Sequence, residues 1–295
     1  MSCQDCPRSC AALRSQERSG GFCRCYSLPC VTRAAPHFGE EPCISGTAGA
    51  GAVFFSGCNL RCVYCQNREI SRAASGKMLT VRGLQDVMLR LQDSGVHNIE
   101  LVTPTQHSRV IAEALAGIHL EIPVIWNSSA YESVETLRML EGLVQIYMPD
   151  MKYWHSETAA KFSSAPDYPV FASAAIQEMF RQRGPYQFDE NGLLRSGLLI
   201  RHLILPGHTE ESMDVIDFVA DSFPQGSVLF SLMSQYTPMV SSEAFPELSR
   251  CVTAEENRNL IHYMQGRHIT DGYWQEISSS GVESIPEFDG SGLDN

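Results

Sequence analysis

A short loop carries three cysteines at a spacing that suits a metal or an iron–sulfur cluster. Cys58, Cys62 and Cys65 lie within eight residues. Three thiolates on a four-iron cluster leave one iron without a protein ligand, and such an open iron can bind a substrate. A tetrahedral zinc site needs a fourth ligand, which Cys43 or a histidine would have to supply. The spacing favours the iron–sulfur cluster over zinc.

Four cysteines near the N-terminus have the paired spacing of a second, closed metal site. They are Cys3, Cys6, Cys10 and Cys23. Four thiolates leave no open coordination position, so this site would be structural zinc or an electron-relaying iron–sulfur cluster. The cysteine-rich segment 1–50 has few periodic apolar residues. We therefore expect loops that are held by metal rather than by a hydrophobic core.

The other cysteines and the composition bound the class of protein. Cys25, Cys30 and Cys43 are additional thiols, and Cys251 is expected to be a small buried apolar residue. Ten of the eleven cysteines lie in the first 65 residues and no signal peptide is visible, which favours a cytoplasmic protein with metal or redox chemistry. The formal net charge of −12 argues against a nucleic-acid partner. No apolar run is long enough for a membrane span.

Alternating strands and helices must position the cysteine loop. Apolar runs predict six strands, at 52–55, 99–102, 123–126, 144–148, 198–205 and 228–232. Amphipathic patterns predict helices at 81–94, 110–118, 134–140, 157–162, 170–181, 210–221 and 253–265. Thr80 is the expected cap of the first helix, and Thr253 with Glu256 a capping box for the last. A hairpin tip is expected at 189–192.

This alternation predicts an α/β fold, a partial (β/α)6 barrel, because apolar strands separated by helices pair in parallel. Six units are too few for a closed eight-stranded barrel. We expect the barrel to span residues 51–240. It follows the cysteine-rich segment and precedes a C-terminal extension, 241–295, that packs on the barrel.

Polar residues just past the strand ends should gather at one mouth of such a barrel. After the cysteine loop these are Thr103, Thr105, Asn127, Asp150, Lys152, Arg201 and Tyr236. Plainer roles are open to them: Lys152 as a solvated charge, Arg201 in a structural salt bridge, Asn127 as a helix cap. His202 faces away from Arg201 on the same strand and is expected to be a core or surface histidine.

The cysteine loop resembles the three-cysteine motif of radical S-adenosylmethionine (SAM) enzymes, including the aromatic Tyr64 before the last cysteine. The string from Phe54 to Cys62, followed by Cys65-Gln66-Asn67, is similar to the branch that activates glycyl radical enzymes. It is most similar to homologues of pyruvate formate-lyase activating enzyme. The resemblance runs from Cys3 to about Phe288 and is more specific for the chemistry than for the substrate.

The resemblance implies an oxidoreductase with a [4Fe–4S] cluster on the three thiolates and SAM on the open iron. Reductive cleavage of SAM would give methionine and a 5′-deoxyadenosyl radical, which abstracts a hydrogen atom from the substrate. The protein must orient the reactants and exclude water. An electron donor such as flavodoxin or ferredoxin is implied, and so is a glycyl radical enzyme whose glycine is the hydrogen donor.

The resemblance also implies roles for single residues at the mouth. Asn67 matches a residue that contacts SAM, and Tyr64 would lie against the adenine. Tyr236 stands where some activating enzymes place a histidine near the adenine. Asp150 and Lys152 match an Asp-x-Lys motif in which the carboxylate can bind ribose hydroxyls or a cation, and the lysine can pair with an anionic group.

One departure from the family follows the second strand. The Gly-Gly-Glu turn that holds the SAM amino group is absent, and Thr103 and Thr105 offer hydroxyl acceptors in its place. Alternatively, both threonines only cap the next helix. Arg201 matches a strand-5 arginine of the family, and Asn127 is a further candidate cofactor contact. The opening Cys-Pro-Arg-x-Cys also occurs in the homologues, which supports metal at the N-terminal cysteines.

Three functions remain compatible with the sequence. The first is activation of a glycyl radical enzyme. The second is radical SAM modification of another peptide or a small molecule, with the N-terminal metal as an auxiliary centre. The third is a zinc-stabilised binding or scaffold protein without radical chemistry, and the intact set of Cys58, Cys62 and Cys65 speaks against it.

Overall fold

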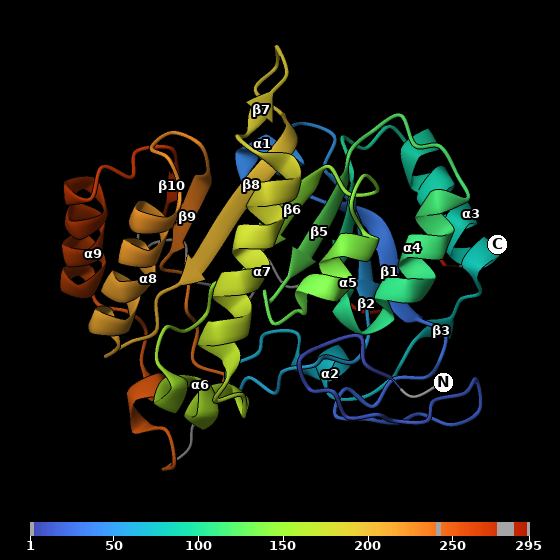
Figure 1. Cartoon of the computed structure of the whole chain (residues 1–295), viewed down its shortest axis with the longest axis horizontal. Coiled ribbons are helices and arrows are strands. Elements are labelled where there is room, and N and C mark those ends of the chain that lie inside the picture. The colour runs from blue at the N-terminus through green and yellow to red at the C-terminus, as the bar shows by residue number, and fades with distance from the viewer. Residues whose placement is uncertain (1–2, 240–242, 276–285, 294–295) are drawn as a thin grey trace.

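One curved sheet organises the part of the chain that the computed structural model describes, residues 3–239, 243–275 and 286–293 (Figure 1). Its strands are β1 (Cys30–His37), β2 (Ala50–Phe55), β3 (Lys77–Met78), β4 (Ile99–Val102), β5 (Val124–Ser128), β6 (Ile146–Pro149), β7 (Gln187–Phe188), β8 (Leu194–Leu203), β9 (Leu229–Met233) and β10 (Gly272–Trp274). The order is β10-β9-β8-β6-β5-β4-β2-β1-β3, with β7 paired to β8. Because β10 and β3 lie at opposite ends of this order, the described sheet is open, as expected for a partial barrel.

The six predicted strands are β2, β4, β5, β6, β8 and β9, and neighbours in this series pair in parallel. Parallel pairing brings their carboxyl ends to one edge. Two additions extend the barrel. β10 pairs in parallel with β9, and β1 pairs antiparallel with both β2 and β3.

The helices are α1 (Pro42–Ser45), α2 (Arg68–Ser71), α3 (Val81–Asp93), α4 (Ser108–Ala116), α5 (Val134–Met139), α6 (Ser156–Ser163), α7 (Tyr168–Arg183), α8 (Thr209–Ser222) and α9 (Ala254–Gly266), with short 3-10 turns at Thr105–His107 and Pro246–Ser249. The longer helices α3, α4, α7 and α8 cover the outer face of the sheet (Figure 1). All seven predicted helices are present. The Thr80 hydroxyl accepts from the Gly83 amide, and Thr253 with Glu256 forms the predicted capping box. None of the helices described here is long and apolar enough to cross a membrane.

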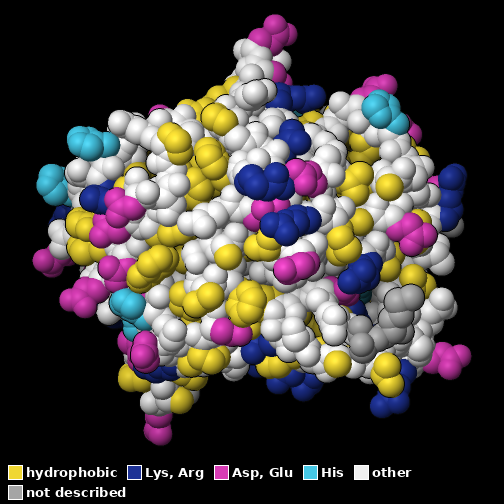
Figure 2. All heavy atoms as spheres, in the orientation of Figure 1, with side chains coloured by type: hydrophobic (Ala, Val, Ile, Leu, Met, Phe, Trp, Pro, Cys, Tyr) yellow, Lys and Arg dark blue, Asp and Glu magenta, His cyan; other side chains and the backbone are white. Residues whose placement is uncertain are grey.

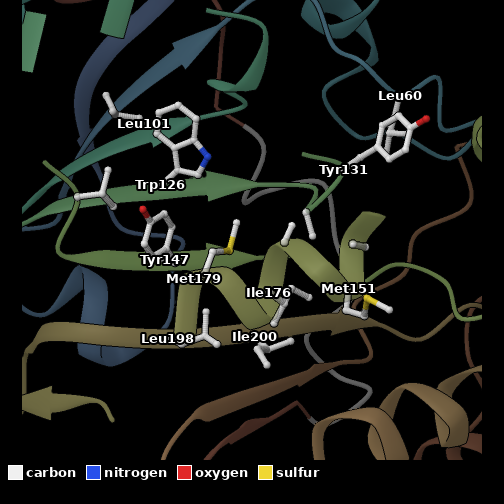
Figure 3. Packing of buried hydrophobic residues seen from close by; sticks show 14 of the residues in the cluster. Leu60, Leu101, Trp126, Tyr131, Tyr147, Met151, Ile176, Met179, Leu198 and Ile200 are labelled. Atoms are coloured by element: carbon white, nitrogen blue, oxygen red, sulfur yellow. The ribbon is translucent and has the colours of Figure 1, made fainter. Parts of the chain in front are cut away.

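The main hydrophobic core lies between the helices and the sheet (Figure 3). Ile176 and Met179 of α7 point toward Tyr147 of β6 and toward Leu198 and Ile200 of β8, and all five side chains are fully buried. On the outer surface of the helices, basic and acidic side chains are interspersed rather than segregated (Figure 2).

The expectation that residues 1–50 form only loops is wrong for their second half. Six residues of β1 pair with β2, and the apolar Val31 and Ala34 are buried. The sequence lacks a period-2 pattern here because β1 is irregular, with a register shift between Val31 and Arg33. Cys30 and Cys43 are buried in β1 and α1 respectively.

Two smaller expectations have opposite outcomes. Cys251 is exposed rather than buried, because its neighbour Val252 supplies the buried side chain at this point. The hairpin tip at 189–192 is confirmed: β7 and β8 pair antiparallel across it, and Gly192 has the positive φ of +77° that such a turn needs.

Candidate active site

A cavity of about 480 Å³ is lined by the cysteine loop, by residues at the carboxyl ends of the parallel strands and by the loop that follows β1. This volume is in the usual range for small-molecule sites. Eleven predicted site residues line it, namely Cys58, Cys62, Tyr64, Cys65, Asn67, Thr103, Thr105, Asn127, Asp150, Lys152 and Arg201. The tertiary structure therefore brings the cysteine loop and the strand-end residues together.

The cysteine loop leaves β2 through Gly57, whose φ is +76° and where a Cβ would collide with the Cys25 sulfur. Burial raises the pKa of the Cys58 and Cys62 thiols, and their mutual charge repulsion raises the pKa of Cys58 further. Lys152 acts in the opposite direction on both thiols. A cation bound among the thiolates would remove the penalty of burying their charge.

Hydrogen bonds hold this loop from two sides. The Ser163 hydroxyl donates to the Cys62 sulfur at 2.9 Å, and the Leu60 amide donates to the Cys58 sulfur at 3.4 Å. Ser163 also bonds to the Tyr153 hydroxyl at 2.6 Å, which in turn bonds to the Tyr64 hydroxyl at 2.7 Å. This buried chain ties the aromatic residue of the motif to a cysteine ligand candidate. The role of Ser163 and Tyr153 carries no motif signal in the sequence.

Tyr236 is the predicted cofactor residue that does not line the cavity. Its hydroxyl donates to the Leu248 carbonyl at 2.7 Å, and its ring packs edge-on against Tyr64 with centroids 6.2 Å apart. The side chain therefore supports Tyr64 from behind. The predicted position of the side chain is wrong, because spacing along the chain predicts that a residue lies at a strand end but does not predict the direction in which its side chain points.

An ion-pair network surrounds Arg201 at the base of the mouth. Its Nε donates to Asp150 at 2.8 Å, its Nη1 to Glu40 at 2.6 Å and its Nη2 to Asn127 at 2.9 Å. Lys152 Nζ donates to the other oxygen of Asp150 at 2.9 Å. Burial alone would raise the pKa of Asp150, but the charges of Arg201 and Lys152 outweigh it and lower that pKa.

The structural roles that the sequence left open for these residues have different outcomes. Lys152 is not a solvated charge, because it is largely buried and paired with Asp150. Arg201 does form salt bridges, and it also lines the cavity. Asn127 does not cap a helix: it lies within β5, and its Nδ2 donates to Glu100 at 2.6 Å. His202 is a core histidine, with ring nitrogens 2.7 Å from the Met151 carbonyl and 2.8 Å from the Ser212 hydroxyl.

The two threonines that follow β4 have different surroundings. Thr103 has a φ of 59°, a left-handed backbone that β-branched residues rarely adopt, and its carbonyl accepts from Gln106 Nε2 at 2.7 Å. Thr105 donates its hydroxyl proton to the buried Glu132 at 2.8 Å. The oxygens of both side chains can still accept a hydrogen bond from a ligand, but Thr105 has no proton left to donate.

Sequence reasoning missed three acidic residues at the floor of the cavity. Glu40 and Glu41 come from the loop between β1 and α1 and line the cavity, and the fully buried Glu100 lies behind Asn127 on β4. In the sequence, Glu40-Glu41-Pro42 has the pattern of a solvated turn. The sequence signal that could have indicated a buried acidic group is Glu100, an acidic residue within an apolar strand.

The N-terminal segment, residues 3–29, packs against the outside of the cysteine loop. Arg8 Nε donates to the Asn59 carbonyl at 2.9 Å, and its guanidinium lies 3.8 Å from the Phe22 ring centroid. Arg14 pairs with Asp5 at 3.1 Å and donates to the Gln106 carbonyl at 3.0 Å. These contacts place the segment beside the loops that follow β2 and β4.

The four N-terminal thiols lie near one another but outside the cavity. Burial, with the charges of Cys23, Cys3 and Cys10, raises the pKa of the Cys6 thiol to about 12. Arg14 Nη2 lies 2.9 Å from the Cys3 sulfur. Within residues 3–239, 243–275 and 286–293, no three Cys, His, Asp or Glu side chains are arranged to hold a single metal ion. The second metal centre therefore stays a prediction.

Comparison with known proteins supports the first cluster. Residues 44–148 match the family model described as a 4Fe-4S single cluster domain. This segment contains the cysteine loop and the strands from β2 to β6. The uncharacterized protein MJ0674 of Methanocaldococcus jannaschii is 28% identical over 264 residues, which cover 86% of this chain and 71% of the relative.

Of two similar solved structures, the first shares the fold at low sequence identity. Streptococcus suis SuiB, crystallised with its precursor peptide SuiA, superposes with a TM-score of 0.51 at 12% identity, covering 74% of this chain and 46% of SuiB. The chain thus spans about half the length of SuiB. A domain of pyruvate-formate lyase-activating enzyme from Bacteroides vulgatus has a TM-score of 0.39 at 12% identity, with 66% of this chain and 91% of that domain covered. The chain thus combines a segment similar to a 4Fe-4S cluster domain with the partial-barrel fold of SuiB, in agreement with the radical SAM resemblance of its cysteine loop.

Proposed function

We propose that this protein is a radical SAM enzyme, an oxidoreductase that abstracts a hydrogen atom from a substrate held in the cavity. The observation that carries the proposal is that one cavity is lined both by Cys58, Cys62 and Cys65 and by the eight SAM-contact candidates that surround them. The match of residues 44–148 to a 4Fe-4S cluster domain supports it.

The donor set of the loop fits a cluster with one open iron. Three thiols face the cavity. Cys43, the cysteine that would complete a zinc site, belongs to a separate apolar cluster with Ile125 and Leu199. A scaffold protein held by zinc at the loop would need such a fourth ligand.

Cys58, Cys62 and Cys65 would hold the cluster, which would supply the electron for reductive cleavage of SAM and thereby the means to take a hydrogen atom from the substrate. The residues of the chain bind and orient the cofactor and the substrate. Asp150, fixed by Arg201 and Lys152, offers an ionised carboxylate to ribose hydroxyls or to a cation. Ser163 donates a hydrogen bond to Cys62, which stabilises its thiolate.

Two finer proposals concern partners. The motif resemblance supports a glycyl radical enzyme as the protein whose glycine loses hydrogen, and flavodoxin or ferredoxin as the cytoplasmic electron donor. The second candidate substrate is another peptide or a small molecule. SuiB, whose fold this chain shares, was crystallised with a precursor peptide, and this observation favours a peptide.

The test is anaerobic reconstitution followed by reduction in the presence of SAM. We expect about four irons per chain in the loop's cluster and formation of 5′-deoxyadenosine. The matched control is Cys58→Ala treated in the same way. Product that does not exceed this control would rule out the proposed chemistry.

A further inference from the structure

We infer that the floor of the cavity is a subsite for a positively charged organic group of the substrate, an ammonium or a guanidinium, held by Glu41. This inference rests on the proposed function, because it places SAM at the cysteine loop and the substrate below it. The alternative occupant is an inorganic cation, and the experiment below separates the two.

The floor of the cavity is built by the loop that closes the barrel from below. β1 runs antiparallel to β2, with His37 opposite Ala50 at the start of β2, so residues 38–41 emerge at the amino ends of the parallel strands. α1 then turns inward, where Cys43 and Ile44 are buried. This path carries Glu40 and Glu41 into the interior beneath Arg201.

The two cations of this region are already engaged. Arg201 donates through all three nitrogens, to Asp150, Glu40 and Asn127. Lys152 donates to Asp150. Glu41 Oε2 remains 3.9 Å from Arg201 Nη1, beyond hydrogen-bond distance.

Arg201 is surrounded by more acidic groups than the cations of this region can neutralise. These are the carboxyl groups of Glu40, Glu41, Glu100 and Asp150, and Lys152 adds the second positive charge. Burial raises the pKa of Glu100 well above its ordinary value, so this group is neutral, and three carboxyl groups remain for the two cations. A ligand that brings one more positive charge would reduce this excess in a site where water screens poorly.

Two buried carboxylate oxygens have no hydrogen-bond partner, Glu41 Oε2 and Glu100 Oε2. The Glu41 side chain is only 9% exposed and lines the cavity. Burial raises the pKa of Glu41, and the charge of nearby Arg201 offsets this only in part, so a bound cation would hold the carboxyl in its ionised form. Buried acceptors are normally paired, so an unpaired carboxylate oxygen on a residue that lines a cavity is a candidate partner for a ligand donor.

An ammonium or guanidinium group supplies the hydrogen-bond donors that these carboxylate oxygens lack. Each has several N–H donors and no acceptor, and each carries the charge that strengthens a bond to carboxylate. The walls beside Glu41 suit the rest of such a molecule: Ser231, Tyr273 and Gln275 line the same cavity and offer polar contacts, while Leu203 and Met233 offer apolar ones.

The experiment measures binding of small probes by ligand-observed NMR to the anaerobically reconstituted protein with SAM. The probes are n-butylamine and n-butylguanidine, with n-butanol as the neutral control and butyrate as the anionic one. We expect the cationic probes to bind at least tenfold more tightly than butanol. Glu41→Gln should abolish this preference, and Glu255→Gln, an exposed position on α9, should leave it unchanged.

A second pair of probes distinguishes a free amine from one carried by a peptide. These are acetyl-Gly-Lys-Gly-amide and the same peptide with norleucine in place of lysine. Preference for the lysine peptide together with butylamine indicates a peptide-borne group, and preference for butylamine alone indicates a small molecule. Either result supports the subsite.

Two outcomes separate this inference from the proposed function, and a third distinguishes an organic from an inorganic cation. SAM cleavage with no preference for cations over butanol would overturn the subsite and leave the proposed function standing. Cation binding that depends on Glu41, without any SAM cleavage, would support the subsite and overturn the proposed function. Displacement of butylamine by equal concentrations of potassium or sodium would show an inorganic cation site and overturn the organic one. The preference for cationic probes over butanol is measured on the wild-type protein, so the test gives a result even if Glu41→Gln misfolds.

Discussion

The cysteine loop and the N-terminal segment hold the same reactive residue type in different surroundings. In the loop, Cys58, Cys62 and Cys65 face a cavity and follow directly from a sheet strand. In residues 3–29 the thiols lie outside the cavity, among irregular backbone whose contacts are made by arginine side chains such as Arg8. Clustered cysteines alone thus leave the kind of site open, and the adjoining cavity is what makes the loop the candidate active site.

The two regions are nevertheless adjacent. The Cys25 sulfur lies 3.6 Å from the Ser56 carbonyl and fills the space where Gly57 has no side chain. Gln106 joins them from the other side, because its Nε2 donates to the Gly57 carbonyl and its own carbonyl accepts from Arg14. Changes in one region should therefore reach the other by contact.

The largest expected effect comes from the loop itself. Cys62→Ala should reduce 5′-deoxyadenosine formation to the level without enzyme, because two thiolates hold a four-iron cluster too weakly. Iron content and product are measured after anaerobic reconstitution. The matched control is Cys251→Ala, an exposed cysteine that is not part of the cavity lining, which should retain full activity. Full activity of Cys62→Ala would show that the loop is not the cluster site.

The second effect tests whether the N-terminal thiols bind a separate metal. Cys6→Ala should remove one zinc or about four irons per chain and leave the loop's cluster in place. A structural zinc site contributes about 10–16 kcal/mol of apparent binding energy, so its loss should also open the segment to proteolysis. Metal analysis and limited proteolysis give the readouts. Wild-type protein without a second metal, and with all four thiols freely alkylated, would refute the prediction.

The third effect separates cofactor binding from cluster assembly. Asp150→Asn keeps the shape but removes the charge that Arg201 and Lys152 hold in place. SAM affinity should fall about tenfold, equivalent to about 1.4 kcal/mol, while iron content stays unchanged. Equilibrium dialysis measures the affinity, with Asp86→Asn on the exposed side of α3 as the control. Unchanged SAM affinity would remove Asp150 from the site.

The fourth effect concerns the pH dependence of stability. Burial lowers the pKa of His107, which lies beside Gln106, to about 3. In the unfolded chain its pKa is about 6.5, so the unfolded state binds more protons below pH 6.5. The contribution of His107 to the free energy of unfolding is therefore fully present above pH 6.5. It decreases by about 1.4 kcal/mol per pH unit as the pH drops toward 3.

Urea unfolding at pH 7 and pH 5 measures this loss. His107 should account for about 2 kcal/mol of it, and His107→Gln should flatten the dependence by that amount. His262→Gln, an exposed position on α9, should not. If His107→Gln keeps the full pH dependence, other buried groups cause it.

The sequence by itself determined the local elements and the cluster loop. Six apolar runs, the Thr80 cap and the Thr253–Glu256 capping box are signals within a few residues, and the structure contains them as predicted. Asp150 and Arg201 were found because parallel strands bring their ends to one edge.

Only the tertiary structure decided which residues form the floor of the cavity. Glu41 follows an irregular strand whose pairing with β2 joins residues that no local period connects. The Tyr236 hydroxyl donates to the Leu248 carbonyl, and Val252 rather than Cys251 is part of the main hydrophobic core. Spacing along the chain specifies the period of a helix or strand, but the direction of a loop side chain depends on long-range packing.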